Sequence, residues 1–408
     1  MDLLVYEHVA GGGFADEKIP TSALSEGYGM LTTLISDFKA AGYNVTTLLD
    51  SRLKASSPPI EADNIIPISS QEELDKALEK LPRAVDAVYT IAPESNDVLQ
   101  RLVKTVEMSG GISLNCQVDA IDKASNKMTT YEILKKNGLR VPDTLTINVH
   151  ENVKRIRRMT SELKFPLVIK PLDGVGCSGL SVVQDENQIV VAVKRIKEES
   201  SNQYYIAQRF IQGVAASVSL ISTGEEALPI TLNKQKVNLA PPNSNSSYNG
   251  GIVPLSHLSE REALEAAQMA VKSLRGLRGY VGVDMVLTRN GPVVMEVNPR
   301  LTTSYVGLRE VVDFNSAQAI IDAVLWQKLP ENVQSSGYAF FSKVKVPPTR
   351  QLFLETYRLK EVISPPFPIA TDEPAYALLA THSSTLKNAQ AAFYRARRRL
   401  LKLFHGGD

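Results

Sequence analysis

Apolar and polar residues follow two different spacing patterns along roughly the first hundred residues of the chain. Apolar runs of strand length occupy 3–9, 43–50 and 86–93. Segments with apolar residues at helical spacing occupy 26–42 and 71–81. Because strands and helices alternate over short connections, we expect a parallel, doubly wound sheet here. Ligands of such sheets bind beyond the carboxyl ends of the strands, where Glu7, Asp50 and Glu94 fall.

The pattern changes after this first region. Residues 125–142 (SNKMTTYEILKKNGLRVP) are expected to form a helix that begins at Ser125 and is stopped by Gly138. Two apolar runs, 165–171 and 180–183, then flank the glycine-rich segment DGVGCSG. Apolar runs on both sides of a short glycine loop predict a hairpin rather than a strand–helix phosphate turn.

The remaining segments are predicted from the same signals. Strands are expected at 204–211 and 216–222, and an amphipathic helix at 259–277. Residues 238–254, rich in Pro, Asn, Ser and Gly, predict a long loop. From about residue 331 we expect a separate C-terminal piece with short strands and a final basic helix.

One glycine-rich segment lies near the start of the chain. GGGF at 11–14 is not followed by a helical pattern and does not form the motif G-x-G-x-x-G. We therefore expect a flexible loop there and no dinucleotide site.

Residues 280–299 (YVGVDMVLTRNGPVVMEVNP) predict a second hairpin, whose register depends on its turn. A two-residue turn at Asn290-Gly291 would place Met285 opposite Glu296 and mix a charge into an apolar face. A three-residue loop with Gly291 in the left-handed conformation avoids this problem. Its pairs are Asp284 with Glu296, Gly282 with Asn298, Met285 with Met295, Val283 with Val297, and Leu287 with Val293. Because side chains alternate along a strand, one face is then wholly apolar, and we favour this register.

That register places two carboxylates opposite each other, which is unfavourable unless something neutralises them. Oxygen ligands of this kind suit Mg²⁺, which binds one or two carboxylates together with substrate phosphates. The alternative is a pair of solvent-facing acids bridged by lysines. Lys170 ends the strand FPLVIK beside the glycine loop, where a cation and backbone N–H groups could hold phosphates. The alternative for Lys170 is a surface lysine with a buried stem.

Composition narrows the function classes. The 408 residues exceed what one hydrophobic core usually serves, so two to four lobes are expected. A formal net charge of +1 gives no electrostatic reason to expect nucleic acid or a membrane as partner. The first residues do not resemble a secretory signal, so a cytoplasmic protein is expected. Cys116 and Cys177 are too few for a disulfide framework or a zinc site, and the five histidines are scattered singly.

Taken together, these motifs resemble those of the ATP-grasp family over roughly residues 3–325. The resemblance implies an α/β and α+β chain with an ATP-grasp fold, an N-terminal Rossmann-like (pre-ATP-grasp) domain and a small C-terminal α+β extension. The implied boundaries are 1–118 for the N-terminal domain, 119–195 for the small ATP-grasp subdomain, 196–330 for the large one, and 331–408 for the extension.

The resemblance also implies roles for individual residues. The implied nucleotide-binding residues are Lys127, Lys170, Gly174, Gly176, Ser178, Gly179, Gln208, Arg209, Phe210 and Ile211. The implied ligands for Mg²⁺ or Mn²⁺, with two ions, are Asp284, Glu296 and Asn298. Arg300 and Lys170 are the implied catalytic residues, and for Arg300 the alternative is a salt bridge to Glu310. Candidate substrate contacts are Glu7, Glu26, Tyr248, Gly250 and Ser304.

Three positions qualify this assignment. Many members of the family carry a ribose-binding acid where this chain has Ala215 in GVAASVSL, and a glutamate where it has Gln208. Ribose contacts must therefore come from elsewhere. Lys123 is not the family's first lysine, because its spacing to Gly138 is four residues too long.

Within the family, the segments VYEHVAGGG, EGYGMLTTLISDF and NPRLTTSYVGLRE are similar to the tyramine–glutamate ligases of methanofuran biosynthesis. This implies that ATP activates the γ-carboxylate of glutamate and that the amine of tyramine then attacks. The implied partners are small-molecule carboxylate and amine substrates, and a homodimer is left open. One alternative is another ATP-grasp amino-acid ligase or a carboxylase, although the carboxylase pattern Glu-His-x-Val-Thr-Glu is absent after EVNPRL. An alternative of another class is a nucleotide-binding sensor without turnover.

Overall fold

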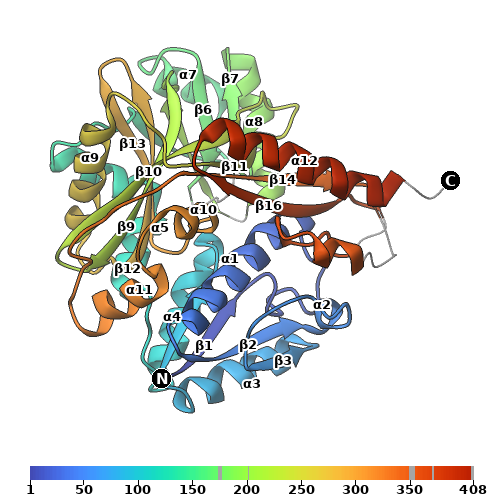
Figure 1. Cartoon of the computed structure of the whole chain (residues 1–408). Coiled ribbons are helices and arrows are strands. Elements are labelled where there is room, and N and C mark those ends of the chain that lie inside the picture. The colour runs from blue at the N-terminus through green and yellow to red at the C-terminus, as the bar shows by residue number, and fades with distance from the viewer. Residues whose placement is uncertain (173–176, 201, 349–353, 370–371, 406–408) are drawn as a thin grey trace.

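The computed structural model describes the chain except for residues 173–176, 201, 349–353, 370–371 and 406–408. Its N-terminal lobe is a parallel four-stranded sheet in the order β3-β2-β1-β4 (Figure 1). The strands are β1 (Asp2–Glu7), β2 (Asn44–Asp50), β3 (Asn64–Ile68) and β4 (Ala87–Ile91). The helices are α1 (Thr21–Ala40), α2 (Ser51–Lys54), α3 (Gln71–Lys80) and α4 (Val98–Met108), with short 3-10 helices η1 (Leu81–Arg83) and η2 (Ser95–Asp97). The predicted parallel, doubly wound sheet is confirmed.

Alternate residues of β1 show how this sheet is covered on both faces. Leu3 and Val5 pack in one core with α1, whereas Leu4 and Tyr6 pack in another core with α3 and α4. All four side chains are almost fully buried. A continuous apolar run therefore marks a strand that is buried on both faces.

The segment GGGF is a packed turn, so the expectation of a flexible loop was wrong. Gly11 and Gly12 are buried, and a Cβ atom at Gly11 would collide with the carbonyl oxygen of Glu7. Gly12 has a φ of +98°, which residues with a side chain rarely adopt. These glycines allow the chain to turn closely against the end of β1.

An antiparallel four-stranded sheet forms the next lobe, in the order β5-β8-β6-β7. The strands are β5 (Thr144–Asn148), β6 (Leu167–Pro171), β7 (Ser181–Val183) and β8 (Tyr204–Arg209). Helices α7 (Val153–Thr160) and α8 (Glu186–Glu199) share the core of this sheet, whereas α5 (Val118–Ser125) and α6 (Lys127–Lys136) pack in a second core with apolar residues of 216–232 and 281–297. The predicted hairpin of β6 and β7 is confirmed. The proposed boundary at 195/196 falls inside α8, and because β8 belongs to this sheet we propose a boundary after Arg209 instead.

The residue that caps the start of α6 lies one position later than expected. Ser125 ends α5, and Asn126 caps α6 by accepting hydrogen bonds from the backbone N–H groups of Met128 and Thr129. The predicted stop is correct, since Gly138 has a φ of +78° just beyond the helix.

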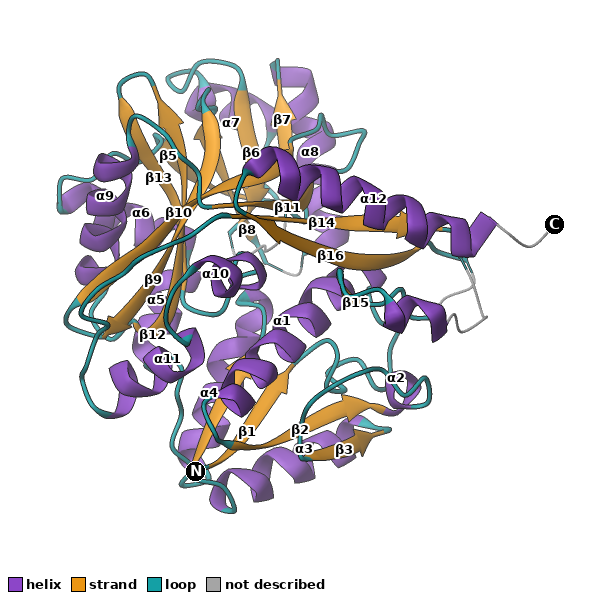
Figure 2. Cartoon of the chain, in the orientation of Figure 1, coloured by secondary structure: helices purple, strands orange, loops and turns teal. Residues whose placement is uncertain are grey.

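An eight-stranded sheet dominates the rest of the chain, in the order β13-β12-β9-β10-β11-β14-β16-β15 (Figure 2). Its strands are β9 (Val214–Thr223), β10 (Ala227–Asn238), β11 (Ser247–Val253), β12 (Arg278–Thr288), β13 (Gly291–Asn298), β14 (Tyr338–Val346), β15 (Val362–Ser364) and β16 (Ala375–Ser383). The accompanying helices are α9 (Glu260–Ser273), α10 (Tyr305–Val311), α11 (Ser316–Leu325), η3 (Leu354–Arg358) and α12 (Leu386–His405). The prediction of a long loop at 238–254 was wrong for the second half of this segment, which forms strand β11.

The C-terminal residues are not the separate piece that the sequence suggested. β14 pairs with β11, and β16 pairs with β14, so both continue the large sheet. Helix α12 covers this part of the sheet and shares a core with Phe340 and Val344 (Figure 1). The hydrogen-bonding edge of β11 is thereby satisfied within the chain.

Helices α1 and α12 have 20 residues each and carry polar residues along their length. Within the described residues, no helix combines the length and the apolar character that a membrane crossing needs.

Candidate functional site

A cavity of about 250 Å³ lies where these lobes meet. Glu26 reaches it from α1, Lys170 from β6, Gln208 from β8, Tyr248 from β11, and Glu296 from β13. The sequence-predicted residues that line it are Glu26, Lys127, Lys170, Ser178, Gln208, Tyr248, Asp284, Glu296, Asn298, Arg300 and Ser304. Residues far apart in the chain thus meet at one site.

The hairpin of β12 and β13 carries the acidic residues, and its register is partly as predicted. Asp284 pairs with Glu296, and Gly282 pairs with Asn298. Nearer the turn the register shifts at a bulge, so that Met285 lies opposite Val294 and Thr288 opposite Gly291. The predicted pairs Met285–Met295 and Leu287–Val293 were therefore wrong. A two-residue turn at 289–290 and one extra residue in β13 give the same acid pairing as the predicted three-residue loop.

Asp284 is held by two neighbouring amides. The Nε2 of Gln235 donates to its Oδ1 at 2.8 Å, and the side chain of Asn298 also hydrogen-bonds to it. Burial, and then the charge of Glu296, raise the pKa of Asp284 to about 6. The charge of Arg300 and the hydrogen bonds from Asn298 and Gln235 favour the ionised form, but they do not outweigh burial and the charge of Glu296.

Glu296 has the opposite balance. Burial opposes its ionisation, but the charges of Lys127 and Lys170 outweigh burial and lower its pKa. The Nζ of Lys127 lies 3.0 Å from the Oε1 of Glu296. The two acids of the pair are therefore distinct, because the lysines approach Glu296 and amides approach Asp284.

These residues fit a magnesium ion. Among the described residues, there is no group of three or more His, Cys, Asp or Glu side chains that could hold a metal. The cavity instead offers two carboxylates and the amide oxygen of Asn298, all hard oxygen donors. This donor set suits Mg²⁺, which takes few protein ligands when phosphates supply the rest. The raised pKa of Asp284 fits as well, since a cation would favour its ionised form.

Lys170 is buried rather than exposed at the surface. Only 7% of the residue is accessible to solvent, and burial, together with the charge of Lys127, lowers its pKa. The alternative of a surface lysine with a buried stem is therefore wrong. A buried ammonium that faces a cavity suits an anionic ligand.

Arg300 pairs with an acid that the sequence analysis did not assign to it. Its Nε lies 2.9 Å from both carboxylate oxygens of Glu94, a residue that is 6% exposed. Glu310 pairs with Arg309 instead, at 2.7 Å, so the predicted alternative of an Arg300–Glu310 bridge was wrong. The position of Glu94 at the end of β4 was the available signal, but nothing in the sequence indicated its partner.

Part of the cavity wall is apolar and suits a flat apolar group. Apolar residues that line it are Val168, Leu180, Val237, Leu239, Ala215, Met285, Val286 and Met295. The Nε2 of Gln208 donates to Thr144 at 2.9 Å, while its Oε1 is buried and has no hydrogen-bond partner among the described residues. A buried acceptor without a partner is a place where a ligand could donate a hydrogen bond.

Other predicted nucleotide contacts do not line the cavity. Arg209 is exposed, and Phe210 and Ile211 are half-buried elsewhere along the same segment. Gly179 donates its N–H to Glu199 at 2.7 Å. Gly174 and Gly176 lie outside the described residues.

Another part of the cavity wall is polar. Tyr248 and Ser304 are hydrogen-bonded through their side chains, and both line the wall together with Glu26. Two further candidates lie elsewhere. Glu7 accepts the N–H of Ala10 at 2.6 Å and is buried, and a Cβ atom at Gly250 would collide with the carbonyl of Phe341.

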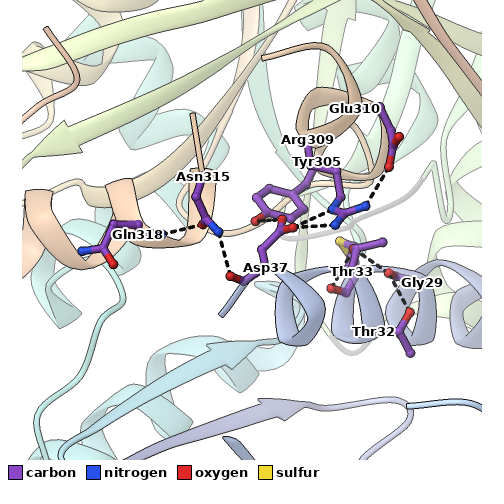
Figure 3. A network of polar contacts seen from close by, with 10 residues as sticks. Gly29, Thr32, Thr33, Asp37, Tyr305, Arg309, Glu310, Asn315 and Gln318 are labelled. Atoms are coloured by element: carbon purple, nitrogen blue, oxygen red, sulfur yellow. Dashed lines mark hydrogen bonds and ion pairs between the residues drawn. The ribbon is translucent and has the colours of Figure 1, made fainter. Parts of the chain in front are cut away.

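A network of polar contacts fixes the N-terminal lobe against the large sheet (Figure 3). Asp37 on α1 accepts hydrogen bonds from Tyr305 at 2.6 Å and from the Nε of Arg309 at 2.8 Å. Its backbone carbonyl accepts a third from Asn315 at 2.8 Å. Because α1 also carries Glu26 and α10 follows Ser304, this network ties together two elements that supply residues to the cavity wall.

The chain matches two family models, those of an ATP-grasp domain over residues 124–304 and of a pre-ATP-grasp domain over residues 43–121. It is 30% identical over 309 residues to a tyramine–L-glutamate ligase of Methanocaldococcus fervens, covering 75% of this chain and 89% of that one. It is 29% identical over 309 residues to the ligase of the same name from Methanocaldococcus jannaschii, covering 75% and 84%. The crystal structure of an L-amino acid ligase from Bacillus licheniformis shares the fold, with a TM-score of 0.66, 17% identity and coverage of 98% and 97%. The chain therefore belongs to the ATP-grasp family of ADP-forming carboxylate–amine ligases.

Proposed function

We propose that this protein joins the γ-carboxylate of glutamate to the amine of tyramine, by way of an acyl phosphate made from ATP. The observation that carries the proposal is that one cavity combines the acid pair of β12 and β13 with three cations and with the polar side chains of Glu26, Tyr248 and Ser304. The relatives named tyramine–L-glutamate ligase support these two substrates.

The residues divide into roles along the cavity. Lys127 and Lys170 bind phosphate oxygens of ATP, and the apolar lining residues together with Gln208 receive the adenine. Asp284, Glu296 and Asn298 hold Mg²⁺, with two ions, which offsets the negative charge of the phosphates. Ala215 lines the cavity and has no polar side chain, so the ribose hydroxyls are bound by other groups.

The reaction needs positioning and charge neutralisation more than covalent help from the protein. An oxygen of the substrate carboxylate attacks the γ-phosphorus, and the bond to the β-phosphate oxygen breaks to release ADP. The neutral amine nitrogen then attacks the acyl carbon, the bond from that carbon to the phosphate oxygen breaks, and the departing phosphate takes up the proton that the nitrogen loses.

Arg300 stabilises the negative charge that develops in both steps. Its Nε is occupied by Glu94, which fixes the planar guanidinium at the cavity wall. A cation that is already oriented costs no reorganisation when the charge develops. Lys170 supports the same charge from β6.

The test is ADP release with Mg-ATP, L-glutamate and tyramine, with the mass of the product read from the same reaction. An amide of glutamate and tyramine is the expected product. ADP without this amide would overturn the substrates but not the ligase chemistry, and bicarbonate-dependent ADP release would indicate a carboxylase. Absence of ADP release with a panel of amino acids and amines would favour the sensor alternative.

A further inference from the structure

The C-terminal residues place a largely buried cation behind the wall of the cavity, next to Glu26. Lys343 on β14 places its Nζ 2.6 Å from the Oε1 of Glu26 and 2.9 Å from the Oγ of Ser22. Its side chain is only 9% exposed. A lysine that is this little exposed and bridges two lobes this closely is not an ordinary surface residue.

Glu26 is thereby held on both of its oxygens. Thr303 donates to its Oε2 at 2.8 Å, while Lys343 holds the Oε1. Glu26 and Thr303 line the cavity, whereas Lys343 is not among the residues that line it. Lys343 therefore lies behind Glu26 and can act on a ligand only through it.

The carboxylate of Glu26 keeps capacity for a ligand. An ionised carboxylate accepts about four hydrogen bonds, and the two contacts above use only part of that capacity. The wall around it also carries the hydroxyls of Tyr248 and Ser304. A fixed carboxylate among hydroxyls suits a small group with several N–H donors and a positive charge.

The C-terminal segment is also fastened to α1, the helix that carries Glu26. Lys18 lies 2.9 Å from carboxylate oxygens of both Asp372 and Glu373, just before α1. The rings of Tyr28 and Phe367 pack edge to face, with centroids 4.9 Å apart. Figure 1 shows α1 beneath β16, and Leu378 of that strand packs against α1 at Gly29. These contacts, just before α1 and along it, hold α1 in a position where Glu26 can contact Lys343.

We propose that Lys343 is a positioning residue for substrate recognition, which orients Glu26 to bind the ammonium group of an amine-bearing substrate. The inference rests on the proposed ligase function and assigns part of the substrate pocket to the C-terminal segment. A carboxylate oriented in advance loses less rotational freedom when the ligand binds.

The experiment compares steady-state kinetics of Lys343→Met, Lys343→Arg and Glu26→Gln with wild type. Lys345→Met is the matched control, because Lys345 lies two residues along the same strand and is exposed. Lys343→Met should raise the KM of one ammonium-bearing substrate, glutamate or tyramine, by about tenfold or more, and leave the KM of ATP unchanged. Lys343→Arg should restore most of the affinity, and Lys345→Met should match wild type.

A double mutant separates positioning from general damage to the fold. If Lys343 acts through Glu26, Lys343→Met should add little to the KM effect of Glu26→Gln. Additive effects, or an unchanged KM for both substrates in Lys343→Met, would overturn the inference while wild-type amide formation upholds the proposed function. If wild type forms no amide from any amino acid and amine, the proposed function fails and this inference fails with it. Should Lys343→Met not fold, Lys343→Gln and Glu26→Gln decide the question in the same way.

Discussion

Asp284 and Glu296 place two carboxylates opposite each other on one face of a hairpin, and the surrounding residues shift the pKa values of the two acids in opposite directions. The lysines lower the pKa of Glu296, whereas burial and the charge of Glu296 raise that of Asp284. Such an unequal pair would be costly in a protein that did not use it. We therefore interpret the unfavourable placement of two carboxylates side by side as a consequence of building a cation site.

Replacing Glu296 by Gln should reduce turnover by at least 10²–10³, on the order of the loss of one transition-state charge contact. The fold should persist, because Gln has nearly the same shape as Glu. The check is the rate of ADP release, together with circular dichroism. Glu262→Gln, an exposed change on α9, is the control and should behave like wild type. Near-normal turnover in Glu296→Gln would contradict the metal assignment.

Glu7 offers a test of stability against pH. Burial raises its pKa to about 7 in the folded protein, from an ordinary value of 4.5. The folded state therefore holds this proton more strongly, and wild type loses stability as pH rises from about 4.5 to about 7. In the variant Glu7→Gln the side chain at this position cannot ionise, so this loss of stability should be absent. Relative to wild type, its free energy of unfolding should rise by roughly 2 to 3 kcal/mol between pH 5 and pH 8.

Urea unfolding at the two pH values measures this difference. Glu79→Gln is the control, since Glu79 is exposed on α3 and its replacement should change stability equally at both pH values. Parallel pH profiles for wild type and Glu7→Gln would show that Glu7 is not held as a neutral acid.

At the scale of elements, a strand bulge and a helix cap determine the positions of functional side chains. The extra residue in β13 shifts the register between the turn and the acid pair. The cap at Asn126 starts α6 so that Lys127 falls in its first turn, next to Glu296. Both features are short and lie within a few residues of the site.

Replacing Asn126 by Ala should cost about 1 kcal/mol of stability, because two backbone N–H groups lose their acceptor. It should also raise the KM of ATP, since Lys127 depends on the first turn of α6. Asn126→Ser keeps an acceptor and should retain most of both properties. Urea unfolding and ATP kinetics measure the two effects. Equal stability of the Ala, Ser and wild-type proteins would contradict the capping role.

At the scale of the whole molecule, the large sheet joins segments from distant parts of the chain. β14 lies between β11 and β16, and its residues Phe340 and Phe341 belong to two separate cores. The C-terminal residues therefore complete the sheet and also support Glu26 in the cavity wall.

Deleting residues 331–408 should abolish cooperative folding, rather than yield a smaller active ligase. The deletion would expose the hydrogen-bonding edge of β11 and uncover apolar residues such as Val253 and Val306. Urea unfolding and analytical ultracentrifugation of the fragment measure the result. A monomeric fragment that unfolds cooperatively and binds ATP would show that the extension is dispensable.

Patterns that are local in the chain could be predicted from the sequence. Alternation with period two placed Asp284 opposite Glu296, and the apolar run before Lys170 indicated a strand beside a glycine loop. The bulge and strand β11 were missed, because an irregular register and a polar strand leave no regular period. The family's motifs are likewise short segments, so they too were visible in the sequence.

The sequence by itself thus determined the family, the doubly wound N-terminal sheet and the acid pair, because each depends on neighbours along the chain or on one hairpin. Only the tertiary structure decided which charges meet. Arg300 contacts Glu94, which is 206 positions away in the sequence, and Lys343 contacts Glu26, which is 317 positions away. No periodicity carries that information, since these contacts follow from how whole lobes pack, and packing depends on the sum of many buried surfaces.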